Sequence, residues 1–155
     1  MAAFDPTTTI RKIESFIASR PEFSDVMVGD PKAPFTSKGL GAAIFMDSQT
    51  IAELMLDGNP LEIHYVAVRV YSLDAFMGET PDEWELQLLR AVGLLQAALW
   101  GDFDLGGTLR TIDLAGEHGR PMSVEYGYVD VGGQMHRVAN MIIPCMVDST
   151  VTPSQ

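Results

Sequence analysis

The chain has 155 residues, with 10 Lys and Arg against 21 Asp and Glu, so its formal net charge is −11. This length predicts one domain, which buries about 70% of the surface of its unfolded chain without a disulfide or a metal. A content of 46% hydrophobic residues excludes a disordered polyanion. The negative charge argues against a nucleic-acid reader and against docking on anionic lipid, because both partners are themselves negative.

Cysteine content and apolar runs narrow the class of protein further. The single cysteine excludes an internal disulfide and a cysteine-based zinc site. No apolar run approaches the roughly 20 residues of a membrane span, and the opening segment lacks the layout of a signal peptide. We therefore expect a protein of a soluble, reducing compartment with no membrane partner.

Helical periodicity predicts two helices. The first covers residues 7–19. The second follows the capping-box sequence Thr80-Pro81-Asp82-Glu83 and ends at Gly101. Its apolar stripe is predicted to consist of Trp84, Leu88, Val92, Leu95 and Leu99, widened by Leu89, Ala91 and Ala98.

Runs of β-branched and aromatic residues predict the strands 26–28, 42–47, 51–56, 61–73, 108–114, 122–131 and 134–147. A tight turn at Ser48-Gln49 would join two of them, and Gly132-Gly133 predicts a hairpin. The glycine- and proline-rich residues 29–41 predict a long loop. The order of elements predicts an α+β fold, in which residues 1–148 form one domain with an antiparallel or mixed sheet against two main helices. Residues 149–155 would be a flexible tail.

The residues that usually carry chemistry form no recognisable site. The three histidines are far apart and lack metal-ligand spacing: His64, His118 and His136. Asp102 and Asp104 begin a calcium-type series that does not continue. Cys145 has apolar neighbours, which would raise the pKa of its thiol, so we expect a buried structural cysteine. We therefore predict no catalytic residue, no metal and no cofactor, and a protein that is not an enzyme.

A resemblance to a known family is spread along residues 7–148. It is carried by residues 10–16, 28–31, 39–44, 64–71, 83–99, 104–107, 127–134 and 137–147. Together these segments resemble the tail terminator proteins of long-tailed bacteriophages, most of all those of actinobacterial phages. The resemblance implies a ring-forming subunit, in a homohexamer that caps the last ring of the tail tube. It also implies a tail tube protein and a head-completion or connector protein as partners.

The same resemblance implies a structural role in the virion, at the head-tail interface, after assembly in the host cytoplasm. The ring would end tube polymerisation and let DNA pass through its lumen at ejection. Six copies would carry 6 × −11 = −66 formal charges. A negative lumen repels phosphate, so DNA would slide without specific binding.

Two loops are our candidates for contacts with partners: the glycine- and proline-rich residues 29–41, and residues 74–79 before the second helix. They contribute Gly29, Asp30, Pro31, Lys32, Pro34, Phe35, Lys38, Asp74, Phe76 and Met77. Ring closure would use strand edges or exposed apolar side chains, because a closed ring needs a heterologous interface.

Two other functions stay open at this point. One is a head-completion or stopper protein of the phage neck. The other is a small acidic enzyme or ligand-binding domain, which would need a deep pocket with convergent polar groups.

Overall fold

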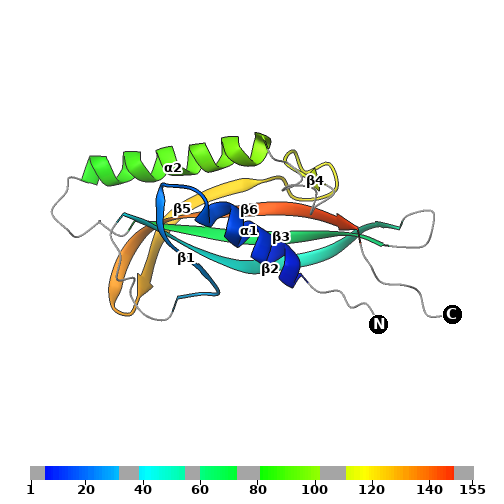
Figure 1. Ribbon diagram of the computed structural model, residues 1–155, viewed down its shortest axis with the longest axis horizontal. Coiled ribbons are helices and arrows are strands. Elements are labelled where there is room, and N and C mark those ends of the chain that lie inside the picture. The colour runs from blue at the N-terminus through cyan, green and yellow to red at the C-terminus, as the bar shows by residue number, and fades with distance from the viewer. Residues whose placement is uncertain (1–5, 32–38, 55–59, 73–80, 102–110, 149–155) are drawn as a thin grey trace.

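The computed structural model describes residues 6–31, 39–54, 60–72, 81–101 and 111–148. They form two helices and six strands in an α+β arrangement (Figure 1). The helices are α1 (Thr7–Ala18) and α2 (Pro81–Gly101). The strands are β1 (Phe23–Val28), β2 (Leu40–Leu54), β3 (Pro60–Ser72), β4 (Thr111–Ile112), β5 (Ser123–Val131) and β6 (Gln134–Asp148).

The six strands make one mixed, curled sheet. Its order is β1-β2-β3-β6, and both β4 and β5 pair with β6. The β1–β2 pair is parallel, while β2–β3, β3–β6, β4–β6 and β5–β6 are antiparallel. Gly132 and Gly133 form the hairpin predicted between β5 and β6, with φ of 58° and 89°. Such left-handed angles suit the two-residue turns that match the twist of a hairpin.

Both helices cover the same face of the sheet. One apolar cluster joins Ile13 and Ile17 of α1 to Leu88 and Leu95 of α2. It also takes alternate residues of the two central strands, namely Val66, Val68, Val70, Met141, Ile143 and Cys145. Alternation places these strand residues on one face, so the main core lies between this face and the two helices. Figure 1 shows α1 crossing in front of the sheet and α2 running along its upper side.

The face without helices carries two smaller clusters. At one end Tyr71 packs with Ala43, Val131 and Val138. At the other end Tyr65 packs with Leu61, Ile63 and Met146. Because Tyr65 and Tyr71 both lie on β3, the alternate residues between them, Ala67 and Arg69, lie in the middle of this face, so Arg69 lies between two apolar patches.

The structure corrects the prediction of two short strands joined by a turn at Ser48-Gln49. Residues 40–54 form one long strand, β2, that pairs with β3 along its length. The register shifts between Met46 and Ser48, and again between Ile51 and Glu53. Each irregularity absorbs an extra residue without ending the pairing, so the polar segment continues as a bulged strand.

The strand predicted at residues 108–114 is also shorter in the described part of the chain. It ends at Ile112, and residues 108–110 lie outside the description. Beyond Ile112 the carboxylate of Asp113 accepts hydrogen bonds from the backbone N–H groups of Glu117 and His118, at 2.9 and 3.0 Å. These bonds close a turn over residues 113–118.

Candidate interaction surfaces

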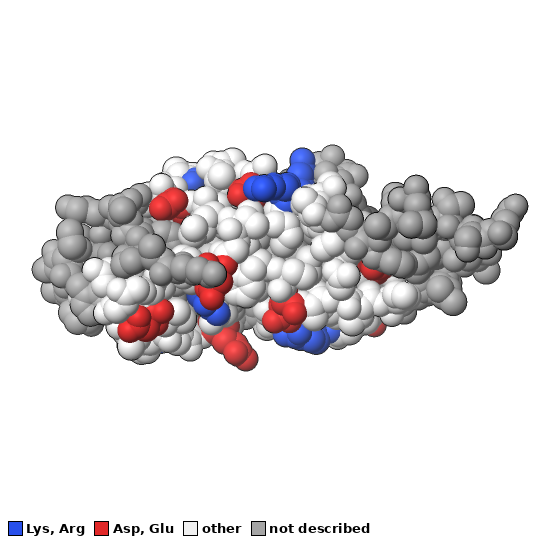
Figure 2. Space-filling model, turned by 90° about the horizontal axis from the view of Figure 1, so that it is seen from below, with Lys and Arg blue, Asp and Glu red and all other residues white. Residues whose placement is uncertain are grey.

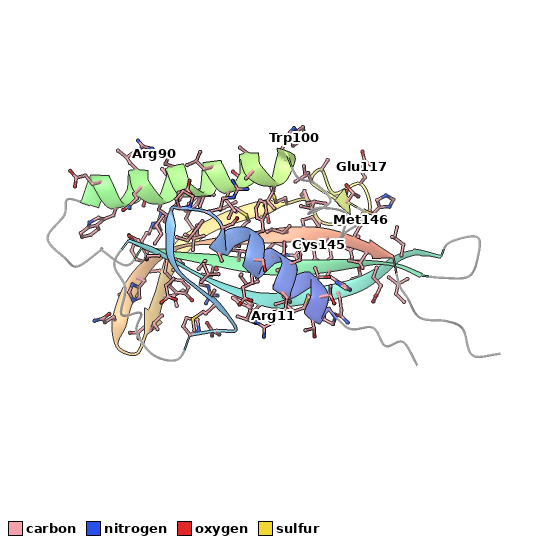
Figure 3. All side chains as sticks on the ribbon, viewed as in Figure 1. Arg11, Arg90, Trp100, Glu117, Cys145 and Met146 are labelled. Atoms are coloured by element: carbon pink, nitrogen blue, oxygen red, sulfur yellow. The ribbon has the colours of Figure 1, made fainter. Side chains whose placement is uncertain are left out.

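The outer face of α2 exposes four large apolar side chains. The buried side of this helix holds Leu88, Val92, Leu95 and Leu99, as predicted. Leu89 was predicted to widen that side, but it is exposed, as are Leu86 and Leu94. Trp100 has 72% of its surface exposed. Figure 3 shows Arg90 and Trp100 pointing away from the sheet.

A helix that is apolar on all sides is normally covered on all sides. Between Leu86 and Trp100, α2 carries only one charged residue, Arg90. Exposed large apolar patches mark interaction sites in proteins that remain soluble. The outer face of α2 is therefore a candidate interaction surface.

An aromatic and arginine cluster lies beside the first turns of α2. The Arg137 guanidinium, on β6, donates to both Glu85 carboxylate oxygens, at 3.1 and 3.2 Å. It lies over the rings of Tyr126 and Tyr128, with its central carbon 5.8 and 4.9 Å from their centroids. The hydrogen bonds to Glu85 raise the pKa of Arg137, so it stays charged. Tyr128 is 68% exposed, and tyrosine and arginine are enriched at energetic centres of interfaces.

Within the described residues, β1, β4 and β5 each pair on one side only, and β2 has no partner on the β1 side beyond Ile44. β1 pairs only with β2, and β5 pairs only with β6. Val131 and Gln134 flank the two-residue turn, so they form a hydrogen-bonded pair. Alternation then turns the backbone groups of Tyr126 and Tyr128 toward the open edge. An unpaired edge of this length is a site for pairing with another chain.

Two arginines lie around a hollow in the middle of the helix-free face. This hollow has a volume of about 230 Å³, with Phe45, Ala67 and Ile142 among its apolar lining. Arg69 Nε donates to Asn140 Oδ1 at 2.6 Å, and Arg69 lies over the Phe45 ring. Arg120 donates to Asp47 at 2.9 Å and lies over the Tyr65 ring. Acidic side chains line it as well, so it is no simple anion site.

A second hollow, of about 480 Å³, lies at the end of α2. Its lining includes Trp100, Glu117 and Met146, which Figure 3 labels, and Asp113 and His118. The Asp113 carboxylate is already bonded to two backbone N–H groups. The Asp113 side chain therefore organises the loop that follows β4. Within the described residues, no group of three or more His, Cys, Asp or Glu side chains could hold a metal ion.

A buried polar contact ties α1 to β3. Thr9 Oγ1 lies 3.0 Å from His64 Nδ1, and both side chains are buried. His64 Nε2 faces the buried Glu62 carboxylate at 3.6 Å. Of the other histidines, His136 is buried and donates from Nδ1 to the Ser72 carbonyl, while His118 is exposed. The structure thus separates the three histidines.

Cys145 is buried, as predicted, among the apolar residues of the main core. Removal from water disfavours the thiolate, which raises the pKa of the thiol to about 12. A thiol in this state is a poor nucleophile. Cys145 therefore acts as a small core residue.

Of the residues predicted for partner contacts, the structure describes Gly29, Asp30 and Pro31. The Gly29 N–H donates to the Ile44 carbonyl at 2.8 Å, and Gly29 has φ +96°, which favours glycine. The exposed Asp30 carboxylate lies 3.4 Å from Arg69 Nη1. The others lie outside the described residues: Lys32, Pro34, Phe35, Lys38, Asp74, Phe76 and Met77.

Sequence reasoning missed the surface formed by α2 and the tyrosines of β5. A signal existed, because after Glu85 the helix holds only Gln87, Arg90 and Gln96 as polar residues. A helix apolar all round has more apolar surface than one sheet face covers. The ion pair between Glu85 and Arg137 has no such signal, because the two residues are 52 positions apart.

Comparison of the amino-acid sequence with known proteins gives no relative. Neither α1 nor α2 is both long and apolar enough for a membrane-spanning helix, among the residues described. No protein-family model matches the chain, and no curated protein matches it either.

Proposed function

We propose that this protein is a structural protein of a phage virion, a tail terminator whose copies form a ring on the last ring of the tail tube. The observation that carries the proposal is a sheet that leaves two unlike strands, β1 and β5, unpaired on one side. The resemblance along residues 7–148 is the basis for three parts of the proposal: that the protein belongs to a phage, that it binds the tail tube and connector proteins, and that the ring has six copies.

The two edges differ in length and chemistry, which favours a head-to-tail contact between copies. β1 spans Phe23–Val28 and exposes Val28. β5 spans Ser123–Val131 and exposes Tyr126 and Tyr128. Contact of β5 in one copy with β1 of the next uses unlike surfaces, and such heterologous contacts form a ring when the rotation closes. Pairing would also cover both edges.

The charge of the chain is compatible with DNA passing close by. Figure 2 views the side of the molecule opposite α2 and shows few basic side chains, several of them beside acidic ones. Affinity for DNA comes largely from neutralising phosphates with cations. A ring built from copies of net charge −11 would let DNA slide through without holding it.

The mass of the purified protein, alone and with tail tubes, tests this proposal. We expect rings, either free or only at tube ends, where they stop further growth of the tube. A strict monomer that also ignores tube ends would contradict the proposal. Loss of the gene should give overlong or unattached tails, whereas heads that leak DNA would indicate a stopper instead.

A matched pair of variants tests the role of the β5 edge. Tyr128→Pro removes the aromatic side chain and also an outward backbone N–H that β6 does not use. Tyr128→Thr removes the same aromatic side chain but keeps the backbone N–H. We expect Tyr128→Pro to weaken ring formation more than Tyr128→Thr. Equal loss in both variants would show that the side chain, and not edge pairing, closes the ring.

A further inference from the structure

We propose that the outer face of α2 binds the same face of a second copy, as two antiparallel helices about a two-fold axis at Gly93. This contact is separate from the edge contact of the proposed ring. It uses a helix, and the ring uses the strands β1 and β5.

The apolar residues of this face are arranged symmetrically about Gly93. Leu86 and Trp100 each lie seven residues from Gly93, and Leu89 and Ala97 each lie four residues from it. Steps of four and seven residues keep side chains on one face of a helix. In an antiparallel pair crossing at Gly93, Leu86 of one copy therefore opposes Trp100 of the other.

Gly93 allows the two helices to approach closely at the centre. A Cβ added at Gly93 would meet no atom within 4 Å, so the position is open to a neighbour. Bulky Leu86 and Trp100, 60% and 72% exposed, then lie at the ends of the contact. Two crossed helices are closest at the crossing point and diverge from it, so a small residue at the centre and large residues at the ends fit this geometry.

Charge does not oppose a second copy at this face, in spite of the net charge of −11. Arg90 is the only charged residue between Leu86 and Trp100. It lies three residues before Gly93, and Gln96 lies three residues after it, so the two-fold contact places Arg90 against an amide rather than another Arg90. No like charges are brought together along the helix pair.

The size of the contact predicts a weak dimer. The 14 steps from Leu86 to Trp100 span about 21 Å, on a helix about 10 Å wide. This footprint is well below the roughly 800 Å² per partner of standard stable complexes. We therefore expect self-association that depends on concentration.

Sedimentation velocity of the full chain, from micromolar to millimolar concentration, tests the dimer. Gly93→Glu adds a charge that meets its own copy at the axis, and we expect it to weaken the dimer at least about tenfold. Glutamate is a better helix former than glycine, so the monomer keeps its fold. Gln87→Glu adds the same charge to the exposed surface of α2 away from the stripe and should change the dimer little.

Disulfide cross-linking tests the two-fold geometry. Gly93→Cys places two thiols at the axis, whereas Gln87→Cys keeps them apart, and a disulfide needs Cα atoms within about 7 Å. Buried Cys145 does not compete. We expect oxidised dimers of Gly93→Cys and not of Gln87→Cys. No self-association at millimolar concentration, an unchanged dimer in Gly93→Glu, or equal cross-linking would overturn the proposal.

The dimer and the ring can fail separately. Tyr128→Pro changes the β5 edge and should leave the α2 dimer intact, while Gly93→Glu leaves both strand edges unchanged. A dimer without rings on tail tubes would contradict only the proposed function. If the protein formed no dimer, and if Gly93→Glu formed rings as well as the unchanged protein does, only the α2 contact would be contradicted.

Discussion

Arg137 and Glu85 join the sheet to α2 through two parallel hydrogen bonds. Arg137 Nε lies 3.1 Å from Glu85 Oε2, and Arg137 Nη2 lies 3.2 Å from Oε1. Such paired geometry is the strongest form of an arginine–carboxylate contact. The same guanidinium covers the rings of Tyr126 and Tyr128, so one side chain orders the surface between α2 and the β5 edge.

We expect Arg137→Ala to lower the free energy of unfolding by about 1–2 kcal/mol. The ion pair contributes at most about 1 kcal/mol, because Glu85 is 40% exposed and solvent screens it. Lost packing on two tyrosine rings accounts for the rest. Urea unfolding measures the change, and Arg90→Ala, an exposed α2 variant, should stay within about 0.5 kcal/mol. Equal losses would show that the cluster adds no stability.

We expect Thr9→Val to destabilise the fold by about 1–3 kcal/mol, although the two side chains have nearly the same shape. The change leaves the buried His64 Nδ1 without its hydrogen-bond partner. Thermal or urea unfolding measures the loss. Thr8→Val, at an exposed position of the same helix, is the control and should be nearly neutral. A neutral Thr9→Val would mean that the hydrogen bond to His64 does not stabilise α1 on the sheet.

Cys145 should react with thiol reagents only when the chain unfolds. Its native pKa is about 12, against an ordinary 9.0, so the unfolded chain releases this proton first as pH rises. The stability that depends on Cys145 is therefore complete below about pH 9 and falls between pH 9 and about 12. Urea unfolding across this range measures the fall, which Cys145→Ala should reduce. Rapid labelling of the native protein would contradict the burial.

Gly116→Ala should destabilise the loop that follows β4 by about 2 kcal/mol or more. Gly116 has φ +72°, and an added Cβ would lie 2.5 Å from the Pro121 backbone nitrogen. Gly127→Ala is the matched control, because a Cβ there meets nothing within 4 Å. Unfolding measured by circular dichroism compares the two. Similar stabilities would show that the loop rearranges at little cost.

Local patterns predicted most of the elements. Helical periodicity located α1 and α2, and β-branched runs located β3, β5 and β6. The boundaries failed where a strand depends on its partner. The polar residues Asp47, Ser48 and Gln49 suggest a turn by themselves, but pairing with β3 carries β2 through them with a bulge. The free energy of that pairing comes from residues distant in sequence.

The candidate surfaces were harder to predict than the core. The burial of Leu88, Val92 and Leu95 followed from spacing, yet spacing also allowed Leu89 to be buried. An apolar stripe that continues around a helix does not show which side meets the sheet. Most of the loop residues proposed for partner contacts lie outside the described chain, and the role of all of them stays a prediction.

The amino-acid sequence by itself determined the α+β class, the hairpin at Gly132-Gly133 and the burial of Cys145, because these depend on local propensity and apolar neighbours. Only the tertiary structure decided that β1 runs parallel to β2, that α2 leaves Leu86 and Trp100 exposed, and that Arg137 meets Glu85. The physical reason is that such contacts join residues far apart in the chain. Their geometry is set by how the sheet curls and how the helices pack on it, which no short segment encodes.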